Sequence, residues 1–155
     1  MNRAAVFIAT FGYVGYFPIA PGTAGSLAAL PLYALVRWSG SVAIELAAIA
    51  VVFAVGVWAS TATERALNRK DPGPVVIDEV LGMLITLAAV PLSWWGVFVG
   101  FLVFRVLDVI KPFPAGRFEH LPSGLGTMAD DAMAGIYGLL LMQAAVWYGP
   151  GWLTA

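Results

Sequence analysis

The sequence predicts an all-α, polytopic integral membrane protein, folded as a compact bundle of about five transmembrane helices. Composition is the first indication, since 61% of the 155 residues are hydrophobic and only 11% are charged, and the mean hydropathy is +0.87. So much apolar surface exceeds what one small soluble core can bury. The apolar residues also form several long segments, and nearly all charges fall in two connections between them.

The first two predicted spans cover residues 23–38 and 42–62. A helix needs roughly 17 to 25 apolar residues to cross a bilayer, and residues 42–62 contain Glu45 as their one charged residue. The first segment, TAGSLAALPLYALVRW, contains Pro31 within its apolar run. We place Glu45 in the interfacial layer at the outer end of the second span.

Residues 79–110 are interpreted as two short spans. The run VLGMLITLAAVPL is followed by SWWG and then by VFVGFLVFRVLDVI. Proline and glycine favour a turn, so the two helices are expected to turn at residues 91–96. The last span covers residues 132–149 and is ended by Pro150 and Gly151.

The charged residues orient these spans. Of the 17 charged residues, seven lie between Glu64 and Glu79 and seven between Arg105 and Asp131. Basic connections remain in the cytoplasm, so both polar connections and the N-terminus are predicted to be cytoplasmic. An aromatic belt is expected at the opposite face, formed by Trp38, Trp94, Trp95, Trp147 and Trp152. A solvated cytoplasmic surface is expected at Glu64, Arg65, Arg69 and Lys70.

Composition also excludes several kinds of chemistry. The formal net charge of −1 provides no basic surface for nucleic acid. The absence of cysteine excludes disulfides, thiolate metal sites and cysteine nucleophiles. The single histidine, His120, has polar neighbours and is expected to be solvated. No repeat or linker is visible, so residues 1–155 are interpreted as one membrane-embedded domain whose N-terminal stretch belongs to the mature protein.

Five carboxylates are predicted to meet at the cytoplasmic boundary from three helices. The third span is opened by Asp78 and Glu79, the fifth by Asp130 and Asp131, and Asp108 lies one turn before the end of the fourth. Two such charges at about 4 Å repel by about 4 kcal/mol at an effective dielectric near 20. A divalent cation would offset this repulsion, and Mg²⁺ prefers oxygen ligands. Helix capping accounts for one acid of each pair and stays open as an alternative.

Two further motifs contain candidate phosphate ligands. The stretch PIAPGTAGS, residues 18–26, places Thr23 and Ser26 at a helix start, where free N–H groups attract phosphate, although the same pattern also simply begins a span. The stretch FRVLDVIKPFP, residues 104–114, supplies the donors Arg105 and Lys111. Both of these could instead be interfacial charges.

Four blocks together resemble the phosphatidylglycerophosphatase A family. They cover nearly the whole chain in the family's order: PIAPGTAGS (18–26), DPGPVVIDEVLG (71–82), FRVLDVIKPFP (104–114) and GLGTMADDAMAG (124–135). Mild departures occur at Gly73, Pro74, Thr127 and Ala129, none of which is an acidic or basic position. The resemblance implies a Mg²⁺-dependent phosphatase of the bacterial inner membrane, multi-pass, with its active site facing the cytoplasm. It would convert phosphatidylglycerophosphate into phosphatidylglycerol and inorganic phosphate.

The resemblance and the charges suggest a role for each polar residue. One or two Mg²⁺ ions would activate a water that attacks phosphorus, with Asp78, Glu79, Asp130 and Asp131 as ligands. Asp108 would be a further ligand or the general base, and a carboxylate nucleophile stays open. The phosphate oxygens would be neutralised by Arg105 and Lys111, with added hydrogen bonds from Thr23 and Ser26. Asp71 either contacts the substrate or pairs with Arg69 or Lys70.

Two other functions stay open at this point. One is a phosphatidyltransferase, which would use the same metal chemistry on a phospholipid headgroup. The other is a small divalent-cation transporter, which would distribute its acids through the membrane depth, whereas here they gather at one boundary. Membrane lipid is the expected partner of the enzyme, and the oligomeric state is left open.

Overall fold

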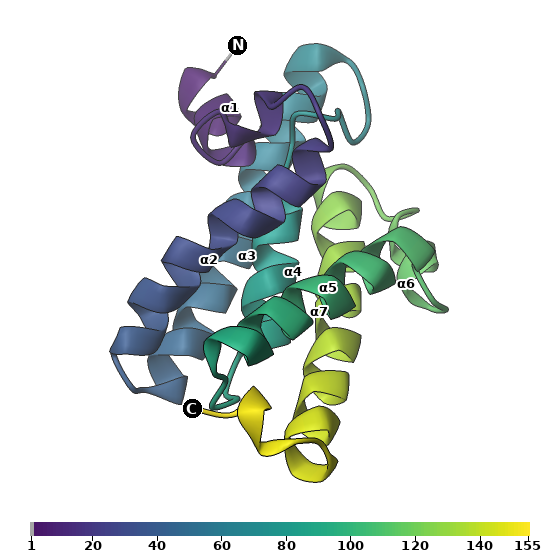
Figure 1. Ribbon diagram of the computed structural model, residues 1–155. Coiled ribbons are helices and arrows are strands. Elements are labelled where there is room, and N and C mark those ends of the chain that lie inside the picture. The colour runs from purple at the N-terminus through teal and green to yellow at the C-terminus, as the bar shows by residue number, and fades with distance from the viewer. Residues whose placement is uncertain (1) are drawn as a thin grey trace.

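The computed structural model describes residues 2–155 as helices joined by short connections (Figure 1). The described residues form seven α-helices and two 3₁₀-helices: α1 (Arg3–Ala9), η1 (Val14–Tyr16), α2 (Pro21–Trp38), α3 (Val42–Leu67), α4 (Ile77–Leu87), α5 (Trp94–Ile110), α6 (Ala115–Phe118), α7 (Gly124–Tyr148) and η2 (Gly151–Leu153). Between residues 2 and 155 there is no strand, and one isolated bridge joins Leu92 and Thr154. The all-α prediction is confirmed.

The predicted apolar segments correspond to the five long helices. Residues 79–110 divide into α4 and α5, as predicted, with the connection between Leu87 and Trp94. The largest difference is in α7, which begins at Gly124 instead of residue 132. Asp130 and Asp131 therefore lie in the second turn of α7, and the prediction that they open a helix is wrong. Capping does not account for this pair.

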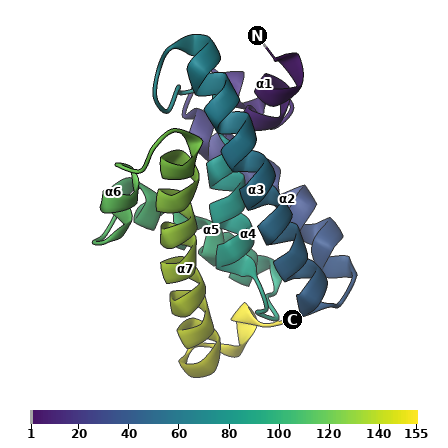
Figure 2. The same cartoon turned by 180° about the vertical axis from the view of Figure 1, so that it is seen from behind.

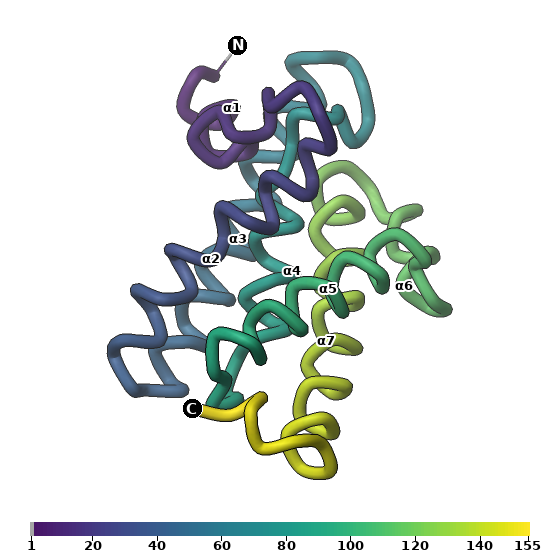
Figure 3. Tube along the Cα trace, viewed as in Figure 1, coloured from purple at the N-terminus to yellow at the C-terminus, as the bar shows by residue number. Residues whose placement is uncertain are grey.

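α4 is the central helix of the bundle. Its side chains Val80, Leu81 and Met83 are fully buried, and it packs against α2, α3, α5 and α7. Figures 1 and 2 show α4 enclosed between α7 on one side and the pair α2 and α3 on the other. The trace in Figure 3 shows α5 crossing the bundle obliquely, and α1 lies at the opposite end of the molecule from the C-terminus.

Facing glycines allow α4 and α7 to approach closely. A Cβ atom added to Gly135 would lie 2.7 Å from the carbonyl oxygen of Gly82, and one added to Gly82 would lie 3.0 Å from the carbonyl oxygen of Asp131. Small residues permit such contacts between membrane helices. Gly82 follows Asp78 by one turn, and Gly135 follows Asp131 by one turn. The same close approach therefore brings these two acids together.

The outer surface carries many large apolar side chains. Trp38 is 88% exposed, Trp94 is 84% exposed and Trp147 is 82% exposed, which suits contact with lipid. Among residues 2–155, α3 is the one helix that is long and apolar enough to cross a membrane, judged by its length and composition. α4 has 11 residues and α5 has 17. The five-span arrangement therefore stays a prediction.

Glu45 is buried within the protein near the start of α3, and its interfacial depth in the membrane stays a prediction. The side chain accepts hydrogen bonds from Nη1 of Arg37 at 2.7 Å and from the backbone N–H of Ala89 at 2.7 Å. The end of α4 lies against the start of α3 here, which brings a backbone donor to the carboxylate. A charge can remain buried at this position because both of its oxygens have partners.

Candidate active site

Three carboxylates from two helices form a compact group, here called the acidic cluster: Asp78 and Glu79 of α4, and Asp131 of α7. One oxygen from each lies within 4.8 Å of the others. Asp78 and Asp131 are buried. Within residues 2–155, Oδ1 of Asp78 and Oε2 of Glu79 are buried without a hydrogen-bond partner.

The acidic cluster suits a bound cation. Buried acceptors without a donor carry a free-energy cost of about 1–3 kcal/mol each, and more when charged. Three like charges at such distances add mutual repulsion. Oxygen donors alone, with no sulfur or imidazole, fit a hard cation such as Mg²⁺ or Ca²⁺. The cluster therefore has the donors and the unmet charge that a divalent metal site requires.

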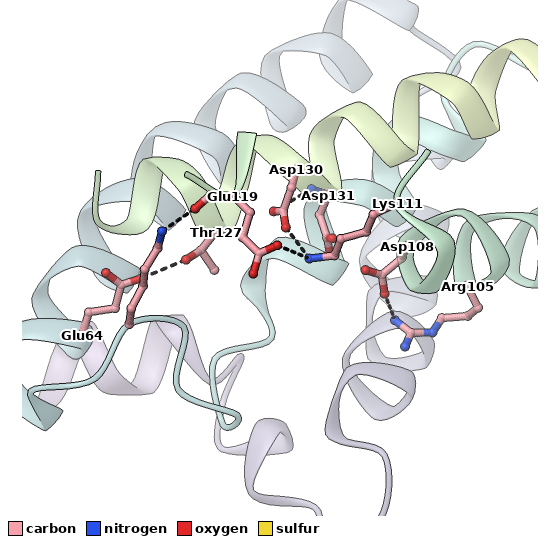
Figure 4. A network of polar contacts seen from close by, with 9 residues as sticks. Glu64, Arg105, Asp108, Lys111, Glu119, Thr127, Asp130 and Asp131 are labelled. Carbon is pink, nitrogen blue, oxygen red and sulfur yellow. Dashed lines mark hydrogen bonds and ion pairs between the residues drawn. The ribbon is translucent and has the colours of Figure 1, made fainter. Parts of the chain in front are cut away.

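Asp130 is turned toward a different partner. Its Oδ2 accepts a hydrogen bond from Nζ of Lys111 at 2.5 Å, and its Oδ1 accepts one from the backbone N–H of Asp131 at 2.9 Å. Of the four predicted metal ligands, the structure therefore brings three together and places Asp130 beside them, paired with Lys111. Figure 4 shows Asp130 and Lys111 pointing toward each other from α7 and the end of α5.

Lys111 reaches α7 because α5 ends just before it. Lys111 has a left-handed backbone conformation, with φ of 46°, so it does not continue the helical face of Asp108. Partial burial alone would lower the pKa of Lys111, but the hydrogen bond and negative charge of Asp130 outweigh it and raise the pKa above its ordinary value. Lys111 is therefore a fixed positive charge next to the acidic cluster.

Arg105 lies at the other side of the cluster, held by two polar groups. Its Nη1 donates to Oδ2 of Asp108 at 2.6 Å and to Oγ of Ser26 at 3.3 Å. The Ser26 hydroxyl in turn donates to the carbonyl of Gly22 at 2.9 Å. Arg105 is thereby oriented between α5 and α2, with the remaining guanidinium donors available for an anion.

The start of α2 touches the acidic cluster directly. A Cβ atom added to Gly22 would lie 2.2 Å from Oε1 of Glu79 and 3.3 Å from Nη1 of Arg105. Only a glycine fits here without displacing one of these groups. Thr23 is the next residue and is half-buried; in the part of the chain described, its hydroxyl makes no hydrogen bond. The predicted phosphate ligands Ser26 and Arg105 are thus joined, whereas Thr23 lies at the edge.

Glu64 of α3 forms a second group of polar contacts, with Thr127, which lies one turn before Asp131 in α7. Glu64 was not identified from the sequence as part of the site. Glu64 is 7% exposed, so the prediction that it lies on a solvated face is wrong. It accepts hydrogen bonds from the Thr127 hydroxyl at 2.8 Å and from the backbone N–H of Asp71 at 3.4 Å. The signal available was its position at the end of a long apolar helix, where a carboxylate can turn inward. Figure 4 shows Glu64 and Thr127 beside the Lys111 network.

Two basic residues connect the surrounding loops. Lys70 donates to the carbonyl of Glu119, and the Glu119 carboxylate lies 4.0 Å from Lys111. Asp71 is surface-exposed, yet packing around its carboxyl group raises its pKa, with Lys111 acting in the opposite direction. Its side chain makes neither of the predicted ion pairs with Arg69 or Lys70 in residues 2–155. His120 is exposed, as predicted.

Comparison with known proteins finds matches that cover most of the chain. The family model described as phosphatidylglycerophosphatase A matches residues 7–146. A Bacteroides thetaiotaomicron protein named "Putative phosphatidylinositol-3-phosphatase" is 36% identical over 92% of this chain and 93% of its own length. Two relatives are named phosphatidylglycerophosphatase A, and each is 39% identical to this chain. The Escherichia coli protein matches 79% of this chain and 72% of its own length. The Haemophilus influenzae protein matches 81% of this chain and 78% of its own length. No solved structure matches the chain.

Proposed function

The chain belongs to the phosphatidylglycerophosphatase A family, and we propose that it hydrolyses the terminal phosphomonoester of phosphatidylglycerophosphate to phosphatidylglycerol and inorganic phosphate. One structural observation carries the proposal at the level of residues. One buried oxygen of Asp78 and one of Glu79 lack a donor, and the other Glu79 oxygen, Oε1, lies with Nη1 of Arg105 around Gly22 at the start of α2. Acceptors for a cation and donors for a phosphate therefore occur side by side, which metal-assisted phosphate hydrolysis requires.

We propose Asp78, Glu79 and Asp131 as the ligands of a divalent cation, with Mg²⁺ as the first choice. A cation held there supplies Lewis-acid polarisation of the phosphoryl group. Asp130 acts through Lys111, because its oxygens are engaged by that side chain and by a backbone N–H. The number of cations stays open.

Arg105 and Lys111 bind the phosphate in this proposal. Arg105 is oriented by Asp108 and Ser26, so we assign Asp108 to positioning, and Ser26 to the same task. During hydrolysis an oxygen nucleophile bonds to phosphorus, the bond from phosphorus to the glycerol oxygen breaks, and that oxygen takes up a proton. Fixed positive charges stabilise the negative charge that moves onto the departing oxygen. Both a water and a carboxylate remain eligible as nucleophile.

We further propose that the protein is a multi-pass protein of the bacterial inner membrane with this site at the cytoplasmic face. The apolar helix α3 and the exposed apolar side chains support membrane insertion. The basic residues Arg65, Arg69 and Lys70 lie at the end of α3 where Glu64 meets the site. Cytoplasmic connections are enriched in such residues.

The test is release of inorganic phosphate from phosphatidylglycerophosphate in mixed micelles. We expect steady release that a chelator abolishes and that added Mg²⁺ restores. Transfer of a phosphatidyl group without phosphate release would indicate a transferase instead. Uptake of metal into proteoliposomes without phosphatase activity would indicate a transporter.

A phosphatidylinositol phosphate is the second candidate substrate. The relative from Bacteroides thetaiotaomicron, whose name refers to phosphatidylinositol 3-phosphate, matches 92% of this chain. Both lipids present a phosphomonoester beside a diacylglycerol anchor, so the same site could receive either. A comparison of kcat/KM for the two lipids in identical micelles decides between them; the proposal requires the larger value for phosphatidylglycerophosphate.

A further inference from the structure

An apolar groove runs along the surface at the start of α2. It has a volume of about 430 Å³ and is lined by Phe17, Ile19, Ala20, Thr23, Ala24 and Leu27. Its lining carries one polar side-chain group, the Thr23 hydroxyl. Ile19 is 75% exposed and Phe17 is 57% exposed, so the groove is open to whatever surrounds the protein.

One turn of α2 contacts the acidic cluster on one side and lines the groove on the other. Gly22 faces Glu79 and Arg105, and the next residue, Thr23, faces the groove. Successive residues of an α-helix are about 100° apart around its axis. The polar and apolar features are therefore adjacent sectors of the same helix turn, with the Thr23 hydroxyl between them.

The groove also extends along α2 away from the acidic cluster, as an acyl chain attached to a headgroup bound there would. Leu27 follows Thr23 by one turn, which is about 6 Å along the helix axis. That direction leads from the acidic cluster toward the opposite end of the bundle, as the course of α2 in Figure 1 shows. A molecule with its phosphate at Arg105 would therefore place an attached chain along Leu27.

We infer that this groove holds an acyl chain of the lipid substrate while the phosphate lies at Arg105 and the acidic cluster. The inference rests on the proposed function, since it takes a phospholipid as the substrate. A saturated or unsaturated chain matches the lining, and the Thr23 hydroxyl suits the ester region where the chain joins the headgroup. The groove thereby gives the enzyme a preference for lipid phosphates over water-soluble phosphate esters.

Another apolar groove lies between α1 and α3 and is the natural rival. It has a volume of about 450 Å³ and includes Phe7, Phe11, Val51, Val55 and Ile77. Ile77 packs toward α3, 3.5 Å from the Cβ position of Gly56, whereas Asp78 belongs to the group formed with α7. This groove therefore opens on a different face of α4 from the acidic cluster, which makes it a matched control.

The experiment fills each groove with tryptophan and compares substrates with and without chains. Ala24→Trp should raise KM about ten-fold for long-chain phosphatidylglycerophosphate. For the deacylated headgroup phosphate it should change kcat/KM by less than about two-fold. Val51→Trp should leave both substrates within about two-fold of the wild type. If Ala24→Trp folds poorly, Leu27→Trp replaces an exposed side chain one turn further along.

Equal losses on both substrates in Ala24→Trp, or a chain-dependent loss in Val51→Trp alone, would overturn the inference. A second measurement does not need turnover: a phosphatidylglycerophosphate analogue with a photoreactive acyl chain is cross-linked to the wild-type protein. Labelling of residues 17–27 that excess unlabelled lipid suppresses supports the groove, and labelling confined to residues 7–12 and 51–55 contradicts it. Absence of phosphate release from any lipid would contradict the proposed function. The cross-linking result would still show whether an acyl chain binds in the groove.

Discussion

Buried carboxylates at the two ends of the bundle differ in whether their oxygens have hydrogen-bond donors. Near the start of α3, Glu45 is 4% exposed and has donors for both oxygens, from Arg37 and from the N–H of Ala89. In the acidic cluster, Asp78 and Glu79 each keep one buried oxygen without a donor in residues 2–155. A buried charge whose oxygens are satisfied is compatible with a purely structural role. A group of buried charges left without donors instead fits the proposed binding of a cation.

This difference also separates stability from activity. At the Glu45 end, removing the carboxylate should cost stability, because its donors lose their acceptor. At the acidic cluster, removing a carboxylate should cost activity and relieve repulsion, since functional sites commonly reduce stability. Substitutions at Asp131, Gly135, Glu45 and Asp71 test this contrast, and their expected effects decrease in that order.

Asp131→Asn should have the largest effect on activity. Loss of one cluster charge is expected to lower kcat for phosphate release by about 10³-fold, with an unchanged or higher melting temperature in chelator. Asp130→Asn is the matched control, because Asp130 pairs with Lys111, and it should lower kcat by about ten-fold. Similar rates for Asp131→Asn and the wild type would remove Asp131 from the proposed metal site.

Gly135→Ala should separate α4 from α7 and thereby disturb the acidic cluster. The new Cβ atom would lie 2.7 Å from the carbonyl of Gly82, so the helices must move apart. We expect kcat to fall by about 10²-fold, as for other small misplacements of catalytic groups. Gly73→Ala is the control, since nothing lies within 4 Å of its Cβ position. Full activity in Gly135→Ala would show that close helix contact does not organise the cluster.

Glu45→Ala should lower stability and leave the chemistry intact. The N–H of Ala89 and the guanidinium of Arg37 lose their acceptor, which should cost about 2 kcal/mol of unfolding free energy. Thermal melting in detergent measures the loss, and Glu45→Gln should recover part of it because an amide oxygen still accepts. Activity of the folded protein should change by less than about two-fold; a loss confined to kcat would contradict a structural role.

Asp71→Asn should have the smallest effect and a defined pH dependence. Packing around its carboxyl group raises the pKa of Asp71 in the folded state, so its ionisation favours the unfolded state, by a small amount because the residue is solvent-exposed. That penalty is absent well below the ordinary pKa of about 3.9, develops as pH rises through it, and is complete above the raised folded pKa. The variant should therefore melt about 1–2 °C higher near pH 7, with the difference shrinking toward pH 4. A constant difference across this range would exclude Asp71 as its source.

Much of the fold and of the site followed from local patterns. Apolar segments placed α2, α3, α4 and α5 near their observed bounds, because helix length and turn residues are local properties. The start of α7 was missed because Gly124 and Gly126 resemble a loop. α1 and α6 were missed because they have seven and four residues, too short for a periodic signal. Their formation depends on packing in the folded chain.

Composition and charge placement are readable from the chain alone: it is apolar, lacks cysteine and has its acids and bases gathered in two connections. The family blocks pointed to the same residues, since residue identity is a property of the chain. Which of these charges face one another depends on the folded arrangement of the helices. It paired Asp130 with Lys111, buried Glu64 and Glu45, and left Asp78 and Glu79 with unpaired oxygens. The reason is physical, because charge pairing depends on distances of a few ångströms, and those are set by helix contacts such as that between Gly82 and Gly135.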